Sequence, residues 1–130
     1  MNSYFIFYVR NQAKSTKFYE HVLDMCPSLN VPGMTEFKLS KLTSFGLMPE
    51  DGIKSLLGDK LPDPRKGRTG SRAELYLQVN NPQAFHQRVL ESGGSELSPL
   101  LARNWGDDVA YSLDLDGHVI AFAKRSEKHV

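Results

Sequence analysis

The sequence predicts an α+β fold in which two repeated βαβββ modules pair curved mixed sheets around a central cavity. An apolar strand followed by an amphipathic helix occurs near residue 4 and again near residue 74. Overlaying the two stretches matches a strand-ending valine, a helix-capping asparagine and three apolar helix positions: Val9 with Val79, Asn11 with Asn81, and Phe18, Val22 and Leu23 with Phe85, Val89 and Leu90. Units of this size bury too little apolar surface separately, so their sheets are expected to share a hollow.

The size and composition of the chain indicate one ordinary globular domain. It has 130 residues with a net charge of +1, which gives no reason to expect nucleic acid or a membrane as partner. No apolar run reaches the roughly 18 residues of a membrane span, and no secretory signal is visible. A single cysteine, Cys26, excludes an internal disulfide. We expect one cytoplasmic domain over 1–130, with module 1 at about 2–57, a linker at 58–72 and module 2 at about 73–125.

The first module begins with a strand at 4–9, which is aromatic or β-branched throughout and apolar on both faces. Asn11 is a good N-cap for the helix that follows. Residues 37–48 predict one or two strands, with a short hairpin favoured. Turn-forming residues fill 49–52. Residues 53–57 fit either a helical turn or a last short strand.

Residues 58–71 contain prolines and glycines without periodicity and predict a linker, or else an anion-binding flap. The second module starts with a strand at 74–79. An Asn-Pro pair at 81–82 marks the start of a helix, because asparagine caps it and proline fits its first position. Gly93 fits the helix end. Residues 95–104 predict a loop or an irregular strand.

The last element is a hairpin over 109–124, where two alternating runs flank Asp116-Gly117. A two-residue turn with positive φ at both positions favours Asp-Gly. The sequence therefore predicts that turn, and the turn sets the register of the final strand.

Three motifs in this order carry a family resemblance. Residues 9–23 read VRNQAKSTKFYEHVL, residues 77–81 read LQVNN before a helix ending in a glycine pair, and residues 113–122 read LDLDGHVIAF. The first is similar to "V-x-D, then S-x-x-FY-x-x-VL", and the last to "D-P-D-G-x-x-I-E-F" with Leu115 in place of proline. The ordered set resembles the vicinal oxygen chelate superfamily of glyoxalases, bleomycin-resistance proteins and extradiol dioxygenases. The resemblance implies the fold, whereas a fold alone does not assign a reaction.

The resemblance also implies where a metal would be held. Metal-dependent members place ligands at four strand positions, which correspond here to Tyr4, to Phe45 or Leu47, to Glu74 and to Ala121. Only Glu74 is a good ligand, whereas catalytic zinc needs three protein ligands and non-haem iron needs two histidines and a carboxylate. We therefore expect no metal and no cofactor.

Other polar groups are interpreted as structural. The histidines do not pair at metal-ligand spacing, and we interpret them as surface or packing residues. His118 is the main candidate for an exception, because it starts a strand near the possible pocket mouth. Asp107 and Asp108 are adjacent, so in a strand their carboxylates face opposite ways. We interpret this pair as solvated loop residues.

The aromatic residues carry the remaining functional signal. Strand alternation places Glu74 and Tyr76 on one face, and Trp105 lies in an otherwise polar loop. Phenol hydroxyls, an indole and a carboxylate suit an aromatic or cationic small molecule. The predicted ligand-binding set is Tyr4, Phe45, Leu47, Glu74, Tyr76, Trp105, Tyr111 and Ala121.

Three functions remain open. The first is a metal-free, homodimeric binding protein that sequesters an aromatic or cationic compound, like the bleomycin-resistance branch. The second is an enzyme of the superfamily, related to its lyases, isomerases or dioxygenases, in which Glu74 is the catalytic general base. The third is a regulatory or structural domain with a filled cavity.

Overall fold

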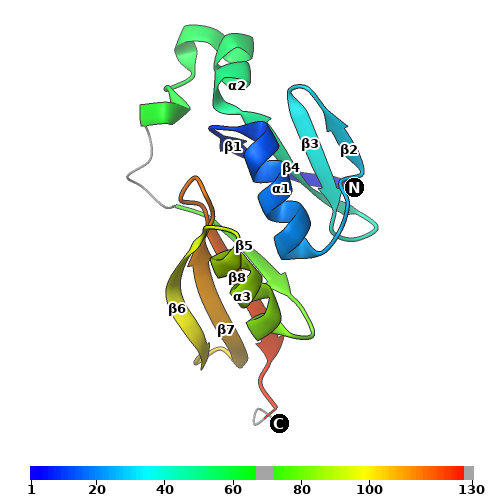
Figure 1. Cartoon of the computed structure of the whole chain (residues 1–130), viewed down its shortest axis with the longest axis vertical. Coiled ribbons are helices and arrows are strands. Elements are labelled where there is room, and N and C mark those ends of the chain that lie inside the picture. The colour runs from blue at the N-terminus through cyan, green and yellow to red at the C-terminus, as the bar shows by residue number, and fades with distance from the viewer. Residues whose placement is uncertain (67–71, 128–130) are drawn as a thin grey trace. The chain divides into compact units, whose positions relative to one another are not determined.

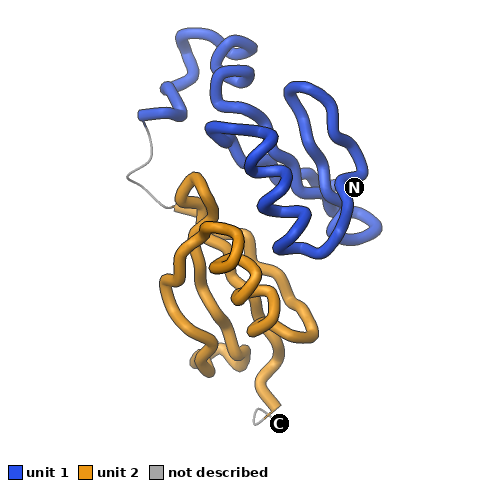
Figure 2. The backbone as a smooth tube through the Cα atoms, viewed as in Figure 1, with its two compact units in different colours: residues 1–70 blue, residues 71–130 orange. Residues whose placement is uncertain are grey.

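The computed structural model describes residues 1–66 and 72–127 and divides the chain into two compact units, residues 1–70 and 71–130 (Figure 2). Each unit holds one four-stranded mixed sheet and follows the βαβββ order. This confirms the predicted α+β class and the two modules. Residues 67–71 of the predicted linker lie outside the described residues. In the described part of the chain, no helix is long and apolar enough to cross a membrane.

The first unit contains a sheet of strand order β1-β4-β3-β2, in which β1 runs parallel to β4 and the other neighbours are antiparallel (Figure 1). Two short 3-10 turns, Gly58–Lys60 and Pro64–Lys66, follow its last helix. The elements are β1 (Ser3–Val9), α1 (Gln12–Leu23), β2 (Leu29–Val31), β3 (Met34–Lys38), β4 (Thr43–Pro49) and α2 (Glu50–Leu57).

Helix α1 covers one face of this sheet and forms the core with it. The Asn11 side chain caps the helix as predicted, accepting the Lys14 N–H at 3.0 Å. Tyr19 meets Phe45 edge to face at a centroid distance of 4.7 Å, and both rings are fully buried with Phe37. Burial of three aromatic side chains is a large hydrophobic contribution for one small unit.

The chain differs from prediction where strand β4 ends. Residues 49–52 were expected to form a turn, but Pro49 is the N-cap of helix α2, and the turn expectation is wrong. The reason is that Glu50 and Asp51 fill the first helical turn, where negative charge is favourable, and that Ile53 becomes buried at 6% exposure. Of the two alternatives for 53–57, the helical one is confirmed.

The second unit contains a sheet of order β5-β8-β7-β6 with β5 parallel to β8. Its helix is capped by Asn81, which accepts the Ala84 N–H at 3.2 Å, and begins at Pro82 as predicted. Phe85 packs against Phe122 at 5.2 Å, so helix α3 covers one face of this sheet, and no helix among residues 72–127 covers the other. The elements are β5 (Glu74–Gln78), α3 (Pro82–Glu91), β6 (Ser95–Ala102), β7 (Asp107–Leu113) and β8 (Val119–Arg125).

The β7–β8 hairpin forms, but its turn is not the predicted one. The Asp114 N–H donates to the His118 carbonyl at 2.9 Å, and the Gly117 N–H donates to the Asp114 carbonyl at 3.2 Å. Within this fully described loop only Gly117 has a positive φ, of 87°. The connection is therefore a turn followed by a left-handed glycine, which is the usual three-residue hairpin loop. Glycine at residue 117 remains essential to it.

Candidate functional site

The helix-free face of the second sheet carries a row of three side chains. The strand register pairs Tyr76 with Ala121 and Ala121 with Tyr111, and paired residues point to the same side of a sheet. Ala121, Val109 and Ala123 are fully buried, and the two tyrosine rings pack against them. The result is a floor of small apolar side chains with one phenol on each side.

A hydrogen-bonded cluster of Trp105, Tyr76 and Asp107 lies beside this row. The Trp105 indole N–H donates to the Tyr76 hydroxyl oxygen at 3.1 Å, and the Tyr76 hydroxyl donates to the Asp107 carboxylate. The turn that presents Trp105 is closed by Gly106, whose φ of 99° suits glycine. Asp107 is only 4% exposed, whereas Trp105 is 52% exposed. An aromatic surface is thus fixed in orientation without being buried.

The two phenols are held in their neutral form. Burial raises the pKa of Tyr76, and its hydrogen bond to Asp107 raises that pKa further. Burial also raises the pKa of Tyr111, and the negative charge of Glu74 adds to this effect. The exposed Glu74 carboxylate therefore lies close enough to act on the Tyr111 phenol, while the positive charge of Arg103 acts on it in the opposite direction.

Arg103 supports the same face from the β6–β7 connection. Its guanidinium lies 5.1 Å from the centre of the Tyr111 ring, and its Nη2 donates to Ser98 Oγ at 2.6 Å and to the Val109 carbonyl at 2.9 Å. Sequence reasoning missed Arg103. Its interpretation of Asp107 as a solvated loop residue is wrong, because Asp107 begins strand β7 and is only 4% exposed. For Asp107 a signal existed, because alternation from Tyr111 along β7 places residues 109 and 107 on one face.

Of the eight predicted ligand-binding residues, five belong to the second unit and three to the first. Tyr4 lies in the first unit on strand β1 and is 53% exposed. Phe45 and Leu47 are fully buried, and Phe45 packs against helix α1. The residues gathered on the second unit are Glu74, Tyr76, Trp105, Tyr111 and Ala121.

The expectation that Phe45 and Leu47 share the face of Tyr4 is wrong. Strand β1 pairs Phe5 with Phe45 and Phe7 with Leu47, so these four residues lie on one face of the sheet, where Phe45 contacts α1 and Phe5 remains exposed. The side chains on the face of Tyr4 are one residue out of phase with them. A shift of one residue moves a strand's whole side-chain set to the opposite face.

The donor set at the four metal positions does not fit a metal. On β4 the residues that share the face of Tyr4 are Ser44, Gly46 and Met48, which offer neither imidazole nor carboxylate. Ala121 contributes only a methyl group, fully buried. Glu74 is then one carboxylate without companions of the required chemistry.

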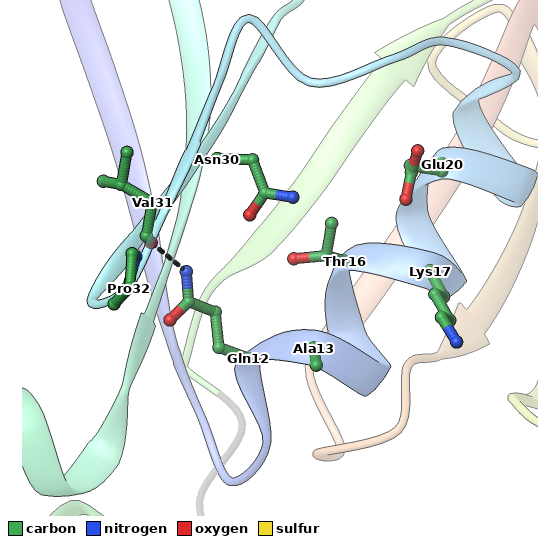
Figure 3. A pocket seen from close by; sticks show the side chains of 8 residues that line it. All are labelled: Gln12, Ala13, Thr16, Lys17, Glu20, Asn30, Val31 and Pro32. Atoms are coloured by element: carbon green, nitrogen blue, oxygen red, sulfur yellow. Dashed lines mark hydrogen bonds between the residues drawn. The ribbon is translucent and has the colours of Figure 1, made fainter.

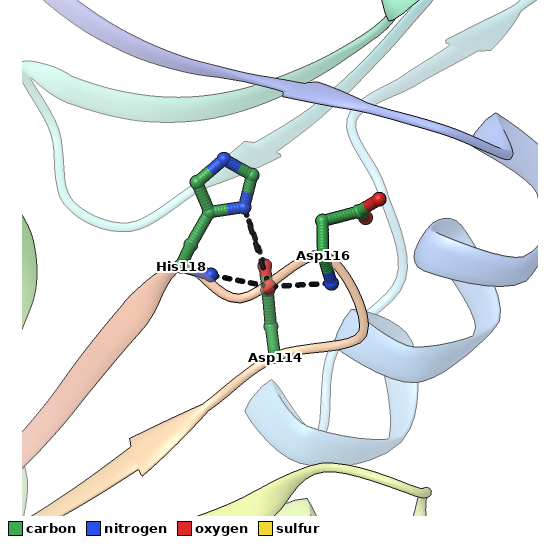
Figure 4. A group of neighbouring side chains, drawn as sticks. All are labelled: Asp114, Asp116 and His118. Atoms are coloured by element: carbon green, nitrogen blue, oxygen red, sulfur yellow. Dashed lines mark hydrogen bonds and ion pairs between the residues drawn. The ribbon is translucent and has the colours of Figure 1, made fainter. Parts of the chain in front are cut away.

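Asp114, Asp116 and His118 in the β7–β8 loop bring three potential ligand atoms within 4.8 Å of one another (Figure 4). The loop itself explains this arrangement. Asp114 Oδ1 accepts the backbone N–H groups of Asp116 and His118 at 2.9 and 2.8 Å, and Asp114 Oδ2 lies 3.0 Å from His118 Nδ1. Asp114 therefore serves as the internal support of the turn.

Comparison with known proteins assigns the chain to a family. The model of the glyoxalase-like domain matches residues 2–126. Among solved structures, a glyoxalase-related enzyme from Fulvimarina pelagi is similar with a TM-score of 0.81 and 16% identity, covering 96% of this chain and 88% of that chain. A glyoxalase/bleomycin resistance protein/dioxygenase family enzyme from Burkholderia phytofirmans PsJN is similar with a TM-score of 0.79 and 15% identity, covering 95% and 97%.

A third similar structure is TioX from Micromonospora sp. ML1, with a TM-score of 0.69, 13% identity and coverage of 97% and 99%. No curated protein sequence matches the chain. At these identities the structural likeness shows the fold, and the family model carries the assignment. The chain belongs to the glyoxalase-like domain family, within the vicinal oxygen chelate superfamily.

Proposed function

We propose that this protein binds a small aromatic or cationic compound on the helix-free face of its second sheet, through its own side chains and without a metal. The observation that carries the proposal is that Trp105 is exposed and yet held in place by hydrogen bonds. Its ring is 52% exposed, yet its indole N–H is bonded to Tyr76, which is itself bonded to the buried Asp107. A large exposed ring held in one orientation loses little conformational freedom when a ligand stacks on it.

Two groups on this face can attract a cation. Glu74 supplies an exposed carboxylate, and the neutral phenol of Tyr76 presents an electron-rich ring, whereas the Tyr111 ring already has the Arg103 guanidinium 5.1 Å from its centre. A cation over an aromatic ring gains about 0.5–2 kcal/mol, depending on how far it is desolvated. An exposed ion pair with Glu74 adds up to about 1 kcal/mol. These contributions together suit reversible binding of a planar cation.

Sequestration is the role that this arrangement supports better than catalysis. A carboxylate works best as a general base where an apolar environment raises its pKa, but the Glu74 side chain is exposed. The other carboxylate of the face, Asp107, is engaged by Tyr76. The exposed Trp105 also argues against a face that serves only as packed core.

The test compares two probes of similar size, one cationic and one neutral. N-methylquinolinium is a permanent planar cation, and 2-methylquinoline is its neutral counterpart at pH 7.5. We expect calorimetry of the full chain to show tighter binding of the cation. Glu74→Gln should weaken that binding by about 1 kcal/mol while leaving the neutral probe unchanged.

Glu91→Gln provides the matched control, because Glu91 is an exposed glutamate on helix α3. Equal effects of the Glu91 and Glu74 substitutions, or no binding of either probe, would reject the proposal. Stoichiometric zinc, nickel, manganese or iron in the purified protein would contradict its metal-free part. A change in Trp105 fluorescence on probe binding, lost in Trp105→Leu with affinity reduced, would place the ring in contact with the probe.

We also propose that the protein is a homodimer. The support is strand β1, an edge strand of the first sheet that bears no charge from Tyr4 to Val9. Its Tyr4, Phe5 and Ile6 are 53, 55 and 38% exposed, and an uncharged apolar edge favours association. Light scattering should give a dimer that Ile6→Lys converts to monomer, whereas Leu56→Lys on helix α2 should not. A monomeric parent chain would reject this proposal.

The cytoplasm is the location we propose for it. The described Cys26 is a free and exposed thiol, and free thiols persist in reducing compartments. Fractionation of cells that express the tagged full chain checks this location, and recovery outside the cytoplasm would contradict it.

A further inference from the structure

A pocket lies within the first unit (Figure 3). It opens between helix α1 and the β2–β3 hairpin and has a volume of about 380 Å³. That volume is within the range of small-molecule pockets, which spans about 300–1,000 Å³. The lining residues are Gln12, Ala13, Thr16, Lys17, Glu20, Asn30, Val31 and Pro32.

The walls of this pocket are tied together by Gln12. Its Nε2 donates to the Val31 carbonyl at 2.8 Å and to Thr35 Oγ1 at 2.9 Å, and its Oε1 accepts the Gly33 N–H at 2.9 Å. One side chain from the first turn of α1 therefore holds the strand end and the tip of the hairpin. A pocket with a fixed frame loses little entropy when it is occupied.

The hydrogen atoms around Thr35 can be assigned by counting. Its hydroxyl has one hydrogen, which it donates to Asn30 Oδ1 at 3.1 Å. Its two lone pairs then accept from Gln12 Nε2 and from the Thr16 hydroxyl, which lies 2.9 Å away. Thr16 has thus used its only hydrogen, so toward the pocket it offers acceptor capacity. Asn30 has used its oxygen and offers its amide N–H groups.

Glu20 adds a charged acceptor one helical turn beyond Thr16, on the same side of α1. Figure 3 shows the Thr16 hydroxyl and the Asn30 amide on facing sides of the pocket, from helix and hairpin, with the Glu20 carboxylate to their right. Neither the Glu20 carboxylate nor the Asn30 amide nitrogen has a hydrogen-bond partner among residues 1–66 and 72–127. Lys17 also lines the pocket, and its amine points away from the Thr16 hydroxyl and the Asn30 amide in Figure 3. Apolar walls come from Ala13, Val31 and Pro32.

We propose that this pocket binds a small primary ammonium compound that carries a neighbouring carbonyl group and a short apolar side chain. The ammonium group donates to Glu20 and to Thr16. The carbonyl oxygen accepts from the Asn30 amide. The apolar side chain lies against the proline and its aliphatic neighbours. This site is separate from the aromatic face, and it takes its specificity from a different pattern of donors and acceptors.

The test uses leucinamide as the probe and N-acetyl-leucinamide as the matched compound without an ammonium group. In an NMR titration of the full chain, leucinamide should shift backbone amide signals around Thr16 and Gly33 and should bind at least about tenfold more tightly than the acetylated compound. Glu20→Gln should remove most of that difference. Ala13→Leu, at an exposed helix position that lines the pocket, should abolish binding while preserving the spectrum.

Glu91→Gln and Gln87→Leu on helix α3 are the matched controls, and both should leave binding unchanged. Shifts confined to residues 72–127, equal binding of the two compounds, or full affinity in Glu20→Gln would overturn the proposal. If Ala13→Leu does not fold, the Glu20 comparison decides alone. Because the Trp105 indole signal reports on the other face, it should not move, which keeps this result independent of the function proposed above.

Discussion

The two tyrosines of the second sheet offer a matched pair of substitutions. Tyr76 and Tyr111 flank Ala121 in the same row, and burial raises the pKa of both. They differ in one respect. The Tyr76 hydroxyl donates to Asp107 and accepts from Trp105, whereas the Tyr111 hydroxyl has no hydrogen bond to any residue in the described ranges. Changing each to phenylalanine removes one oxygen atom in closely similar surroundings.

The expected loss of folding stability depends on which groups lose a hydrogen bond when each hydroxyl oxygen is removed. A hydrogen bond to a charged group contributes about 1.5–3 kcal/mol. In Tyr76→Phe the Asp107 carboxylate, 4% exposed and with Oδ1 lacking a partner among the described residues, would lose its side-chain hydrogen bond. The half-exposed Trp105 indole can bond to water instead, at little cost. We expect a loss of about 2–3 kcal/mol for Tyr76→Phe and at most about 0.5 kcal/mol for Tyr111→Phe.

Urea unfolding followed by circular dichroism measures both variants. With a slope of about 1–2 kcal/mol per molar urea, Tyr76→Phe should lower the unfolding midpoint by about 1–3 M. Its tryptophan emission should also shift, because Trp105 loses its partner. Equal destabilisation by the two substitutions would show that the bond to Asp107 contributes nothing measurable and would refute this reasoning.

Three further predictions concern other parts of the chain. The raised phenol pKa values of Tyr76 and Tyr111 stabilise the fold fully below pH 10.0, and this contribution should be lost as pH rises through the folded-state values; absorbance titration of folded and unfolded protein checks this. Arg65 lowers the pKa of Asp63 to about 2, so Arg65→Gln should return it toward 3.8 in a carboxyl NMR titration. The ion pair between Asp63 and Arg65 should stabilise the fold above pH 3.8, and this contribution should be lost as the pH falls through about 2. Gly94→Ala should cost about 2–4 kcal/mol in urea unfolding, because its Cβ would lie 2.6 Å from a backbone oxygen of β7.

The repeated module was visible in the sequence because strand and helix patterns occur twice in the same order. Two short elements, strand β2 and helix α2, could not be recognised in this way. Strand β2 spans Leu29–Val31 and is exposed throughout, so it lacks the alternation that marks a half-buried strand. Helix α2 begins in residues whose composition also suits a turn, and burial of Ile53 decides between the two. In both cases tertiary contacts outweigh local preference.

The candidate site was predictable to the extent that it depends on alternation. Glu74 and Tyr76 share a strand, so their common face follows from period two alone. The face of β4 that packs against helix α1 depends on the register that pairs Phe45 with Phe5. The sequence of one strand does not specify this register. The contact of Arg103 with Tyr111 arises from the geometry of the β6–β7 connection, which has no local sequence signature.

The alternation of the second sheet has a consequence for protein engineering. Along each strand, successive side chains point alternately toward helix α3 and toward the open face. The two sets of residues can therefore be changed independently. Ala121 is buried between two phenols, so exchanging it for glycine or serine would leave a space beneath the rings or add a polar group there, without altering the residues beneath the helix. Libraries built at 74, 76, 111 and 121 would therefore vary recognition on a constant hydrophobic scaffold, which makes this 130-residue chain a compact starting point for selecting new binders.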